Sequence, residues 1–159
     1  MVEFTLVGIP LIFILISTFE MARGMWQYHT LANAVKAGTR YAVVHGQNCS
    51  ILPNACTVTI SQIAQIIQFY GTGLPTDTLT LTFTPPSGAA TTCTLSDCIA
   101  KQTTGYWPPA GANAPQSKVK ITGVYAFTSG IAMFWPGAGH TQFGGTFNFA
   151  ADSRENIQF

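Results

Sequence analysis

A single carboxylate stands at the start of the most apolar part of the chain. Glu3 directly precedes the run Phe4–Phe19, FTLVGIPLIFILISTF, which contains no charged residue. A carboxylate at membrane depth costs about 2.5–3.5 kcal/mol on insertion scales, so it usually has a partner. Glu3 either lies at the edge of a bilayer, where the helix dipole favours an anion, or meets a positive group when apolar helices bundle. The N-terminal amine of a neighbouring copy is such a group.

The four cysteines form two local pairs, Cys49 with Cys56 and Cys93 with Cys98. Three pairings are possible, but the short loops between pair members favour the sequential disulfides Cys49–Cys56 and Cys93–Cys98 in an oxidising compartment. Zinc is the alternative, yet the spacing from Cys49 to Cys56 is too wide for a fingerlike site. We therefore expect two disulfides and no metal.

Groups that support catalysis are few and scattered. Among the six acidic residues, Asp152 and Glu155 are close in sequence, but they lie in a C-terminal segment. His29, His45 and His140 are far apart, and no Gly-rich phosphate loop follows a strand. The sequence therefore predicts neither an enzyme nor a bound cofactor.

Two aromatic pairs lie in segments rich in glycine and proline. Tyr106 and Trp107 precede a Pro-Pro pair, and Phe134 and Trp135 precede Pro136. Either these rings fill a small core beneath the loops, or they contact a neighbouring subunit or a host, mineral or glycan surface.

The composition favours an extracytoplasmic module. Charged residues make up 8% of the chain and the net charge is +1, whereas a typical soluble domain has about 25% charged residues. No basic patch for nucleic acid is evident, so we expect no nucleic-acid partner. A surface of uncharged polar residues lets identical subunits stack without self-repulsion.

The elements that position these residues begin with one long helix over residues 1–46. Its first half, residues 1–20, contains the apolar run Phe4–Phe19, which covers about 24 Å. This is short of the roughly 30 Å of a bilayer core, and tilt or thinning closes that gap. Its second half, residues 21–46, is amphipathic, with Gly46 as the expected stop. The expected core-facing stripe consists of Met21, Met25, Tyr28, Leu31, Ala32, Val35 and Ala42.

Residues 47–159 are expected to form a disulfide-braced globular head. Thr59 and Gln62 have the form of a capping box, which predicts a short second helix ending near Gly71. Alternation predicts strands at 78–84, 118–127 and 142–151, a long loop over 87–116, and a tail over 152–159 that is exposed or lies on the next subunit. The expected fold class is α+β, a small antiparallel sheet packed on the long helix.

The N-terminal region resembles TadE-like pseudopilins, the tight-adherence (Tad) branch of the type IV pilin superfamily. The matching features are the Glu3-Phe4 pair, Pro10 within the apolar run, the Phe-Glu-x-x-Arg exit at residues 19–23, and the small-rich ending Ala-x-x-x-Gly-x-Arg-Tyr-Ala at residues 34–42. The resemblance covers a little over a quarter of the chain. In that family the glutamate usually stands fifth after the processing site, whereas Glu3 is third here.

The resemblance implies a pilin-like subunit cut by a prepilin peptidase and drawn from the inner membrane by the Tad assembly machinery. Glu3, Phe4 and Pro10 would then act in assembly of a homo-oligomeric extracellular filament. One alternative is a minor pseudopilin that primes or caps a Tad pilus. Another, from a different class, is a membrane-tethered periplasmic binding module.

Overall fold

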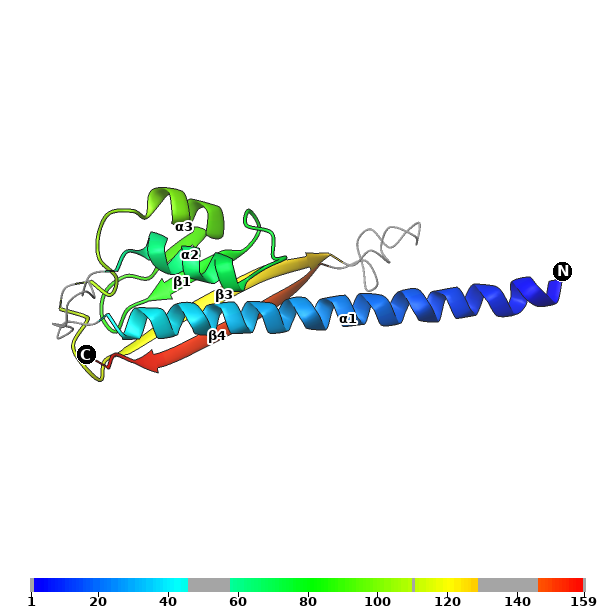
Figure 1. Cartoon of the computed structure of the whole chain (residues 1–159), viewed down its shortest axis with the longest axis horizontal. Coiled ribbons are helices and arrows are strands. Elements are labelled where there is room, and N and C mark those ends of the chain that lie inside the picture. The colour runs from blue at the N-terminus through cyan, green and yellow to red at the C-terminus, as the bar shows by residue number, and fades with distance from the viewer. Residues whose placement is uncertain (1, 46–57, 110, 129–145, 159) are drawn as a thin grey trace.

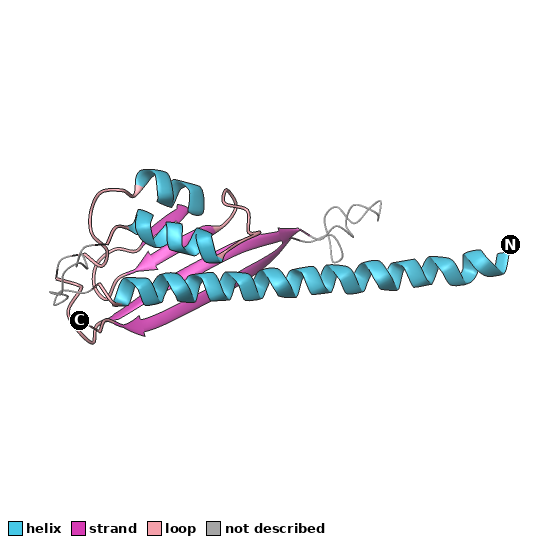
Figure 2. Cartoon of the chain, in the orientation of Figure 1, coloured by secondary structure: helices cyan, strands magenta, loops and turns pink. Residues whose placement is uncertain are grey.

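The computed structural model describes residues 2–45, 58–109, 111–128 and 146–158. A long helix, α1, runs along a four-stranded sheet and continues well beyond it, while two short helices lie beside the sheet (Figure 1). The architecture is α+β, as expected from the sequence. Figure 2 shows that the helical and strand segments form one head around the C-terminal half of α1.

Helix α1 spans Val2–Val43 without interruption. Pro10 lies inside it, although proline removes one backbone hydrogen bond, and the helix is not divided there. The C-terminal half of α1 enters the core through Leu31, Val35 and Ala42, which are fully buried. One helix therefore belongs both to the head and to the projecting rod.

The expected apolar stripe of α1 is covered over only part of its length. Leu31, Val35 and Ala42 are buried as predicted, but Met21, Met25 and Tyr28 are 72%, 64% and 42% exposed. The prediction of one continuous core face is wrong for these three residues, because the described head packs mainly on the part of α1 that follows them.

The sheet contains β1 (Thr80–Thr84), β2 (Thr91–Thr94), β3 (Lys118–Thr128) and β4 (Thr146–Asn156), all antiparallel, in the order β2-β1-β3-β4. Strand β3 buries every second side chain, as a half-buried strand must. Its Gly123 marks a close approach to α1, since a Cβ there would lie 2.9 Å from Val35 Cγ2 and 3.1 Å from Leu31 Cδ1.

Helix α2 spans Ile60–Tyr70 and has the predicted capping box between Thr59 and Gln62. It packs on α1 where Gly38 has no side chain, because a Cβ at Gly38 would lie 2.5 Å from Ile67 Cγ1. The absence of a side chain at Gly38 thus permits the close contact between α1 and α2.

The prediction of a long loop over residues 87–116 is wrong for part of that span. It contains strand β2 and helix α3 (Leu95–Lys101). Helix α3 is too short to show periodicity, but its start has a sequence signal: Thr94 Oγ1 accepts a hydrogen bond from the Asp97 N–H at 3.3 Å. A Thr followed three residues later by an acid is typical of a helix N-terminus.

The prediction of a tail over residues 152–159 is also wrong, because β4 continues through Asn156 against β3. The charged residues of this segment hide the alternation of apolar and polar residues that identifies a strand, but they suit an edge strand. One of them, Asp152, has its Oδ2 atom 3.3 Å from Lys120 Nζ on the paired strand β3. Ile157 is buried, and the Gln158 N–H donates to the Val43 carbonyl at 3.1 Å. The expected start of this strand, residues 142–145, lies outside the described residues.

Candidate assembly interface

The apolar half of α1 is a rod whose large side chains are mostly exposed among the residues that the structure describes. Figure 1 shows it projecting away from the head, and its apolar window is 0% buried. Large exposed side chains are Phe4, Leu6, Val7, Ile9, Leu11, Ile12, Phe13, Ile14, Leu15 and Phe19. By length and composition alone, α1 is apolar enough to cross a membrane. So large an apolar surface marks a site for lipid or protein.

The three predicted assembly residues all lie on this rod. Glu3 is exposed in the first turn of α1, Phe4 is 84% exposed, and Pro10 is exposed in the middle of the apolar run. Within the described part of this single chain, Glu3 forms no ion pair. The charge therefore lies beside an uncovered apolar surface.

Two hydroxyl groups near the end of the rod are satisfied within the helix. Ser17 Oγ donates to the Phe13 carbonyl at 2.8 Å, and Thr18 Oγ1 lies 3.0 Å from the Ile14 carbonyl and 2.9 Å from that of Leu15. Such bonds to the preceding turn leave no hydroxyl hydrogen in need of an external acceptor. The rod can therefore enter an apolar environment without losing these interactions.

An arginine connects the rod to the sheet where the head begins. Arg23 Nη2 lies 3.2 Å from Glu20 Oε2 and donates to the Thr128 carbonyl at 2.8 Å. Its guanidinium also lies 4.9 Å from the centre of the Phe127 ring. The Phe-Glu-x-x-Arg exit is thus a junction that fixes the end of β3 to α1. The i,i+3 spacing of Glu20 and Arg23 is typical of such an ion pair on a helix.

Beside this junction lies an apolar groove of about 560 Å³. We call it the junction groove; its lining residues are Ser17, Glu20, Met21, Gly24, Met25, Tyr28, His29, Phe127, Phe147 and Phe149. Sequence reasoning missed it, because the lining comes from α1 and from two strands more than a hundred residues later in the chain. Met21 and Met25 line this groove, although the sequence placed them in the core-facing stripe.

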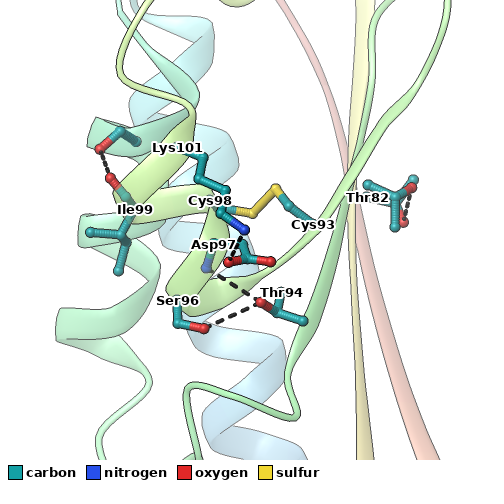
Figure 3. Close-up of a disulfide and its surroundings, with 10 residues drawn as sticks. Thr82, Cys93, Thr94, Ser96, Asp97, Cys98, Ile99 and Lys101 are labelled. Atoms are coloured by element: carbon teal, nitrogen blue, oxygen red, sulfur yellow. Dashed lines mark hydrogen bonds and ion pairs between the residues drawn. A yellow bond between two sulfur atoms is a disulfide. The ribbon is translucent and has the colours of Figure 1, made fainter.

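A disulfide joins Cys93 in β2 to Cys98 in α3, with a Cα–Cα distance of 5.4 Å (Figure 3). Nearby, Lys101 Nζ lies 2.9 Å from Asp97 Oδ1, and Ser61 Oγ donates to the Ile99 carbonyl at 2.7 Å. The disulfide holds α3 on β2, the Ser61 hydrogen bond holds it on α2, and the Lys101–Asp97 ion pair lies within α3. The predicted Cys49–Cys56 pair lies outside the described residues.

The aromatic pair Tyr106 and Trp107 divides between surface and core. Trp107 is 4% exposed and packs edge-on against Phe83, with ring centroids 5.5 Å apart, whereas Tyr106 is 62% exposed. Trp107 is therefore not a surface recognition residue in this chain, and the core-filling interpretation applies to it. Phe134 and Trp135 lie outside the described residues.

No cluster of three or more metal-ligating side chains occurs in the described ranges. His29 lines the junction groove, and His45 Nδ1 lies 2.7 Å from the Tyr41 carbonyl within the same helix. His140 lies outside the described residues.

Residues 1–40 match the family model described as TadE-like protein. Neither the curated proteins nor the solved structures gave a match. The matched segment is most of α1, including the rod and the Arg23 junction. The match supports, over the first quarter of the chain, the resemblance expected from the sequence.

Proposed function

Because its N-terminal helix is TadE-like, we propose that this chain is a structural subunit of an extracellular Tad filament, polymerising through the apolar half of α1. The head would form the outer wall, and the rods would pack together at the filament centre. The role is mechanical and needs neither catalysis nor a cofactor.

One observation supports this proposal: α1 is buried in the head at one end, whereas large apolar side chains at its other end are exposed. Leu31 and Val35 are 0% exposed, while Phe4 and Phe19 are 84% and 70% exposed. Burying a large apolar side chain contributes about 1.5–3 kcal/mol. Association of several rods therefore supplies enough free energy to hold subunits together once they leave lipid.

Before assembly the same surface would hold the subunit in the inner membrane. Helix α1 satisfies the length and composition of a membrane-crossing helix, so one surface would serve lipid first and neighbouring rods later. By resemblance, a prepilin peptidase would process the precursor and the Tad machinery would extract it. Glu3 would then enforce register, because a misplaced subunit leaves a buried charge unpaired.

Negative-stain microscopy of sheared cell-surface material, with an antibody against the head, tests the proposal. We expect thin filaments labelled along their length, and a strain lacking this chain should yield none. Recovery of the chain only as a monomer in the membrane fraction would contradict the proposal. A tethered binding module would give that result.

Stoichiometry separates a main subunit from a minor pseudopilin. A main subunit should be the most abundant protein in sheared filaments, with antibody label along the whole length. A minor pseudopilin would label only filament ends and would be greatly outnumbered by another pilin. That second result would retain the link to the Tad pilus but remove the polymer-forming role.

A further inference from the structure

A polar groove of about 420 Å³ lies between α1 and α2, which pack side by side in the head (Figure 1). We call it the α1–α2 groove; its lining residues are Asn33, Lys36, Ala37, Arg40, Tyr41, Ile66 and Tyr70. The five residues from α1 recur at helical spacing and share one face of that helix. Ile66 and Tyr70 are about one turn apart on α2. The groove therefore has two helical walls.

The close contact between the two helices fixes these walls relative to each other. Gly38 of α1 has no side chain where Ile67 of α2 packs, and a Cβ there would lie 2.5 Å from Ile67 Cγ1. Ile67 is fully buried. Side chains carried on packed helices are held more precisely than side chains on loops, so the groove is preorganised.

Two cations in the α1–α2 groove lie one helical turn apart. Lys36 and Arg40 are both exposed and occupy positions i and i+4 of α1, a spacing at which like charges repel and destabilise a helix. The helix dipole favours Arg40, which is in the last turn, but its effect is confined to that turn and does not account for Lys36.

Nearby carboxylates do not neutralise this pair. None of the described residues that line the groove is acidic. Among the residues that the structure describes, Lys36 forms no ion pair, and Arg40 Nε lies 3.9 Å from Glu155 Oε1, outside the groove lining. An exposed pair at that distance contributes little. An anion bound between Lys36 and Arg40 would remove their repulsion.

The uncharged lining indicates what kind of molecule bears the anion. Tyr41 and Tyr70 each combine an apolar ring with a polar hydroxyl, and Tyr70 is 48% exposed. The Asn33 amide can both donate and accept hydrogen bonds. Aromatic rings cover the C–H face of a sugar, while amide and phenol groups bond to its hydroxyls. Arginine binds a carboxylate through two parallel hydrogen bonds.

We propose that the α1–α2 groove binds an acidic sugar unit, a ring bearing a carboxylate, of a polysaccharide. Lys36 and Arg40 would hold the carboxylate, and Tyr41, Tyr70 and Asn33 would hold the ring and its hydroxyls. The site needs only the folded head, so it goes beyond the proposed function and does not depend on polymerisation. In a filament, repeated copies of the groove would bind one polysaccharide multivalently.

Position along α1 argues against a lipid headgroup as the anion. Asn33 is the groove residue of α1 that is nearest to the rod, and it lies about 21 Å beyond Phe19 at about 1.5 Å per residue. The polar layer of a bilayer extends only about 5–8 Å beyond its hydrocarbon core. While the rod is in the membrane, the groove therefore lies beyond the headgroups, within reach of molecules in solution.

Calorimetric titration of the full chain in non-ionic detergent with trigalacturonate tests the site. We expect Lys36→Gln/Arg40→Gln to weaken binding at least about tenfold, because both charges that hold the carboxylate are lost. The matched control, Lys118→Gln/Arg154→Gln, removes the same charge from exposed positions of β3 and β4 outside the groove. It should bind within about twofold of wild type. Wild-type binding by the groove variant, or an equal loss in the control, would overturn the proposal.

A second pair of variants tests recognition of the ring. Tyr70→Ala should weaken trigalacturonate binding about threefold or more, whereas Phe69→Ala should not, because Phe69 is 75% exposed on the same helix and is not part of the groove lining. Equal effects of these two substitutions would contradict stacking in the groove.

Three further probes define the ligand class. The neutral sugar maltotriose and inorganic phosphate should each bind at least about tenfold more weakly than trigalacturonate, because each lacks one half of the recognised chemistry. Equal binding of phosphate would reduce the groove to a simple anion site, and equal binding of triglutamate would assign it to an acidic protein segment; either result would overturn the sugar assignment. Filament yield does not enter these measurements, so absence of filaments would remove the proposed function and leave this site intact.

Discussion

Gly38 determines how closely α2 approaches α1. A Cβ at this position would lie 2.5 Å and 2.8 Å from Ile67 Cγ1 and Cδ1, and Ile67 is fully buried. Overpacking of this kind costs about 1–3 kcal/mol, which exceeds the gain of about 0.5–1 kcal/mol from replacing a helical glycine by alanine. The contact therefore requires glycine.

Gly38→Ala should accordingly lower the free energy of unfolding, measured by denaturant titration of the detergent-solubilised chain. Gly8→Ala is the matched control in the same helix, because its Cβ would meet only Phe4 Cε1, at 4.0 Å. That variant should be neutral or more stable. Equal effects of the two substitutions would contradict the packing argument.

Glu3 makes a different contribution, since its role arises only on assembly. Glu3→Ala should reduce filament yield at least about tenfold, corresponding to 1.4 kcal/mol or more per subunit, while the head keeps its unfolding midpoint because Glu3 is exposed in the single chain. Glu3→Asp retains the charge and should recover part of the yield. Sheared filaments would be quantified by immunoblot, and unchanged yield from the alanine variant would remove the assembly role.

Among the elements, α3 depends on a disulfide more than on its own helical propensity. The helix is seven residues long, and isolated helices of that length are unstable in water. Cys93–Cys98 joins it to β2, and closing so short a loop stabilises the fold by about 2 kcal/mol in the chain-entropy model.

The double variant Cys93→Ala/Cys98→Ala should therefore lose about 2 kcal/mol of unfolding free energy. Hydrogen exchange should be faster in α3 while α2 keeps its protection. Thr92→Ala, at an exposed position beside Cys93, serves as the control and should change stability by less. A double variant as stable as wild type would show that packing alone holds α3.

The sequence predicted those elements whose local signals agree with their surroundings. The long helix, the capping box of α2 and the alternation of β3 could all be predicted, because each element has one apolar face and a clear start. Helix α3 and strand β2 were missed because they are short and depend on contacts made elsewhere in the chain. The end of β4 was missed because its polar residues, including Asp152 and Arg154, read as a solvated tail. Pairing with β3 overrides that pattern.

The candidate site was predictable only in part for the same reason. Glu3, Phe4 and Pro10 are neighbours in sequence, and their position on a single helix follows from periodicity. The junction groove joins Met25 to Phe147 and Phe149, and no local pattern brings such distant residues together. For Trp107 the sequence left core filling and surface contact both open, and the structure shows that it packs on Phe83.

For the whole molecule, the balance between apolar and charged surface predicts how filaments come apart. Only 8% of residues are charged and the net charge is +1, so screening by salt removes little attraction, whereas apolar burial persists in salt. Filaments should keep their length in 1 M NaCl and dissociate in mild detergent, as measured by sedimentation and microscopy. Dissociation by salt alone would show that ion pairs, rather than rods, supply the cohesion.

The unbroken passage of α1 from rod to head has a mechanical consequence. Val2–Val43 is one helix, with Arg23 fixed to the Thr128 carbonyl at the transition and Gly123 and Gly38 seated against Val35 and Ile67 beyond it. A pull on the rod reaches the head without an intervening hinge. To separate α1 from the head, the pull must move all of these interlocked side chains past one another at once. Tension along the fibre therefore loads the head in shear rather than by peeling.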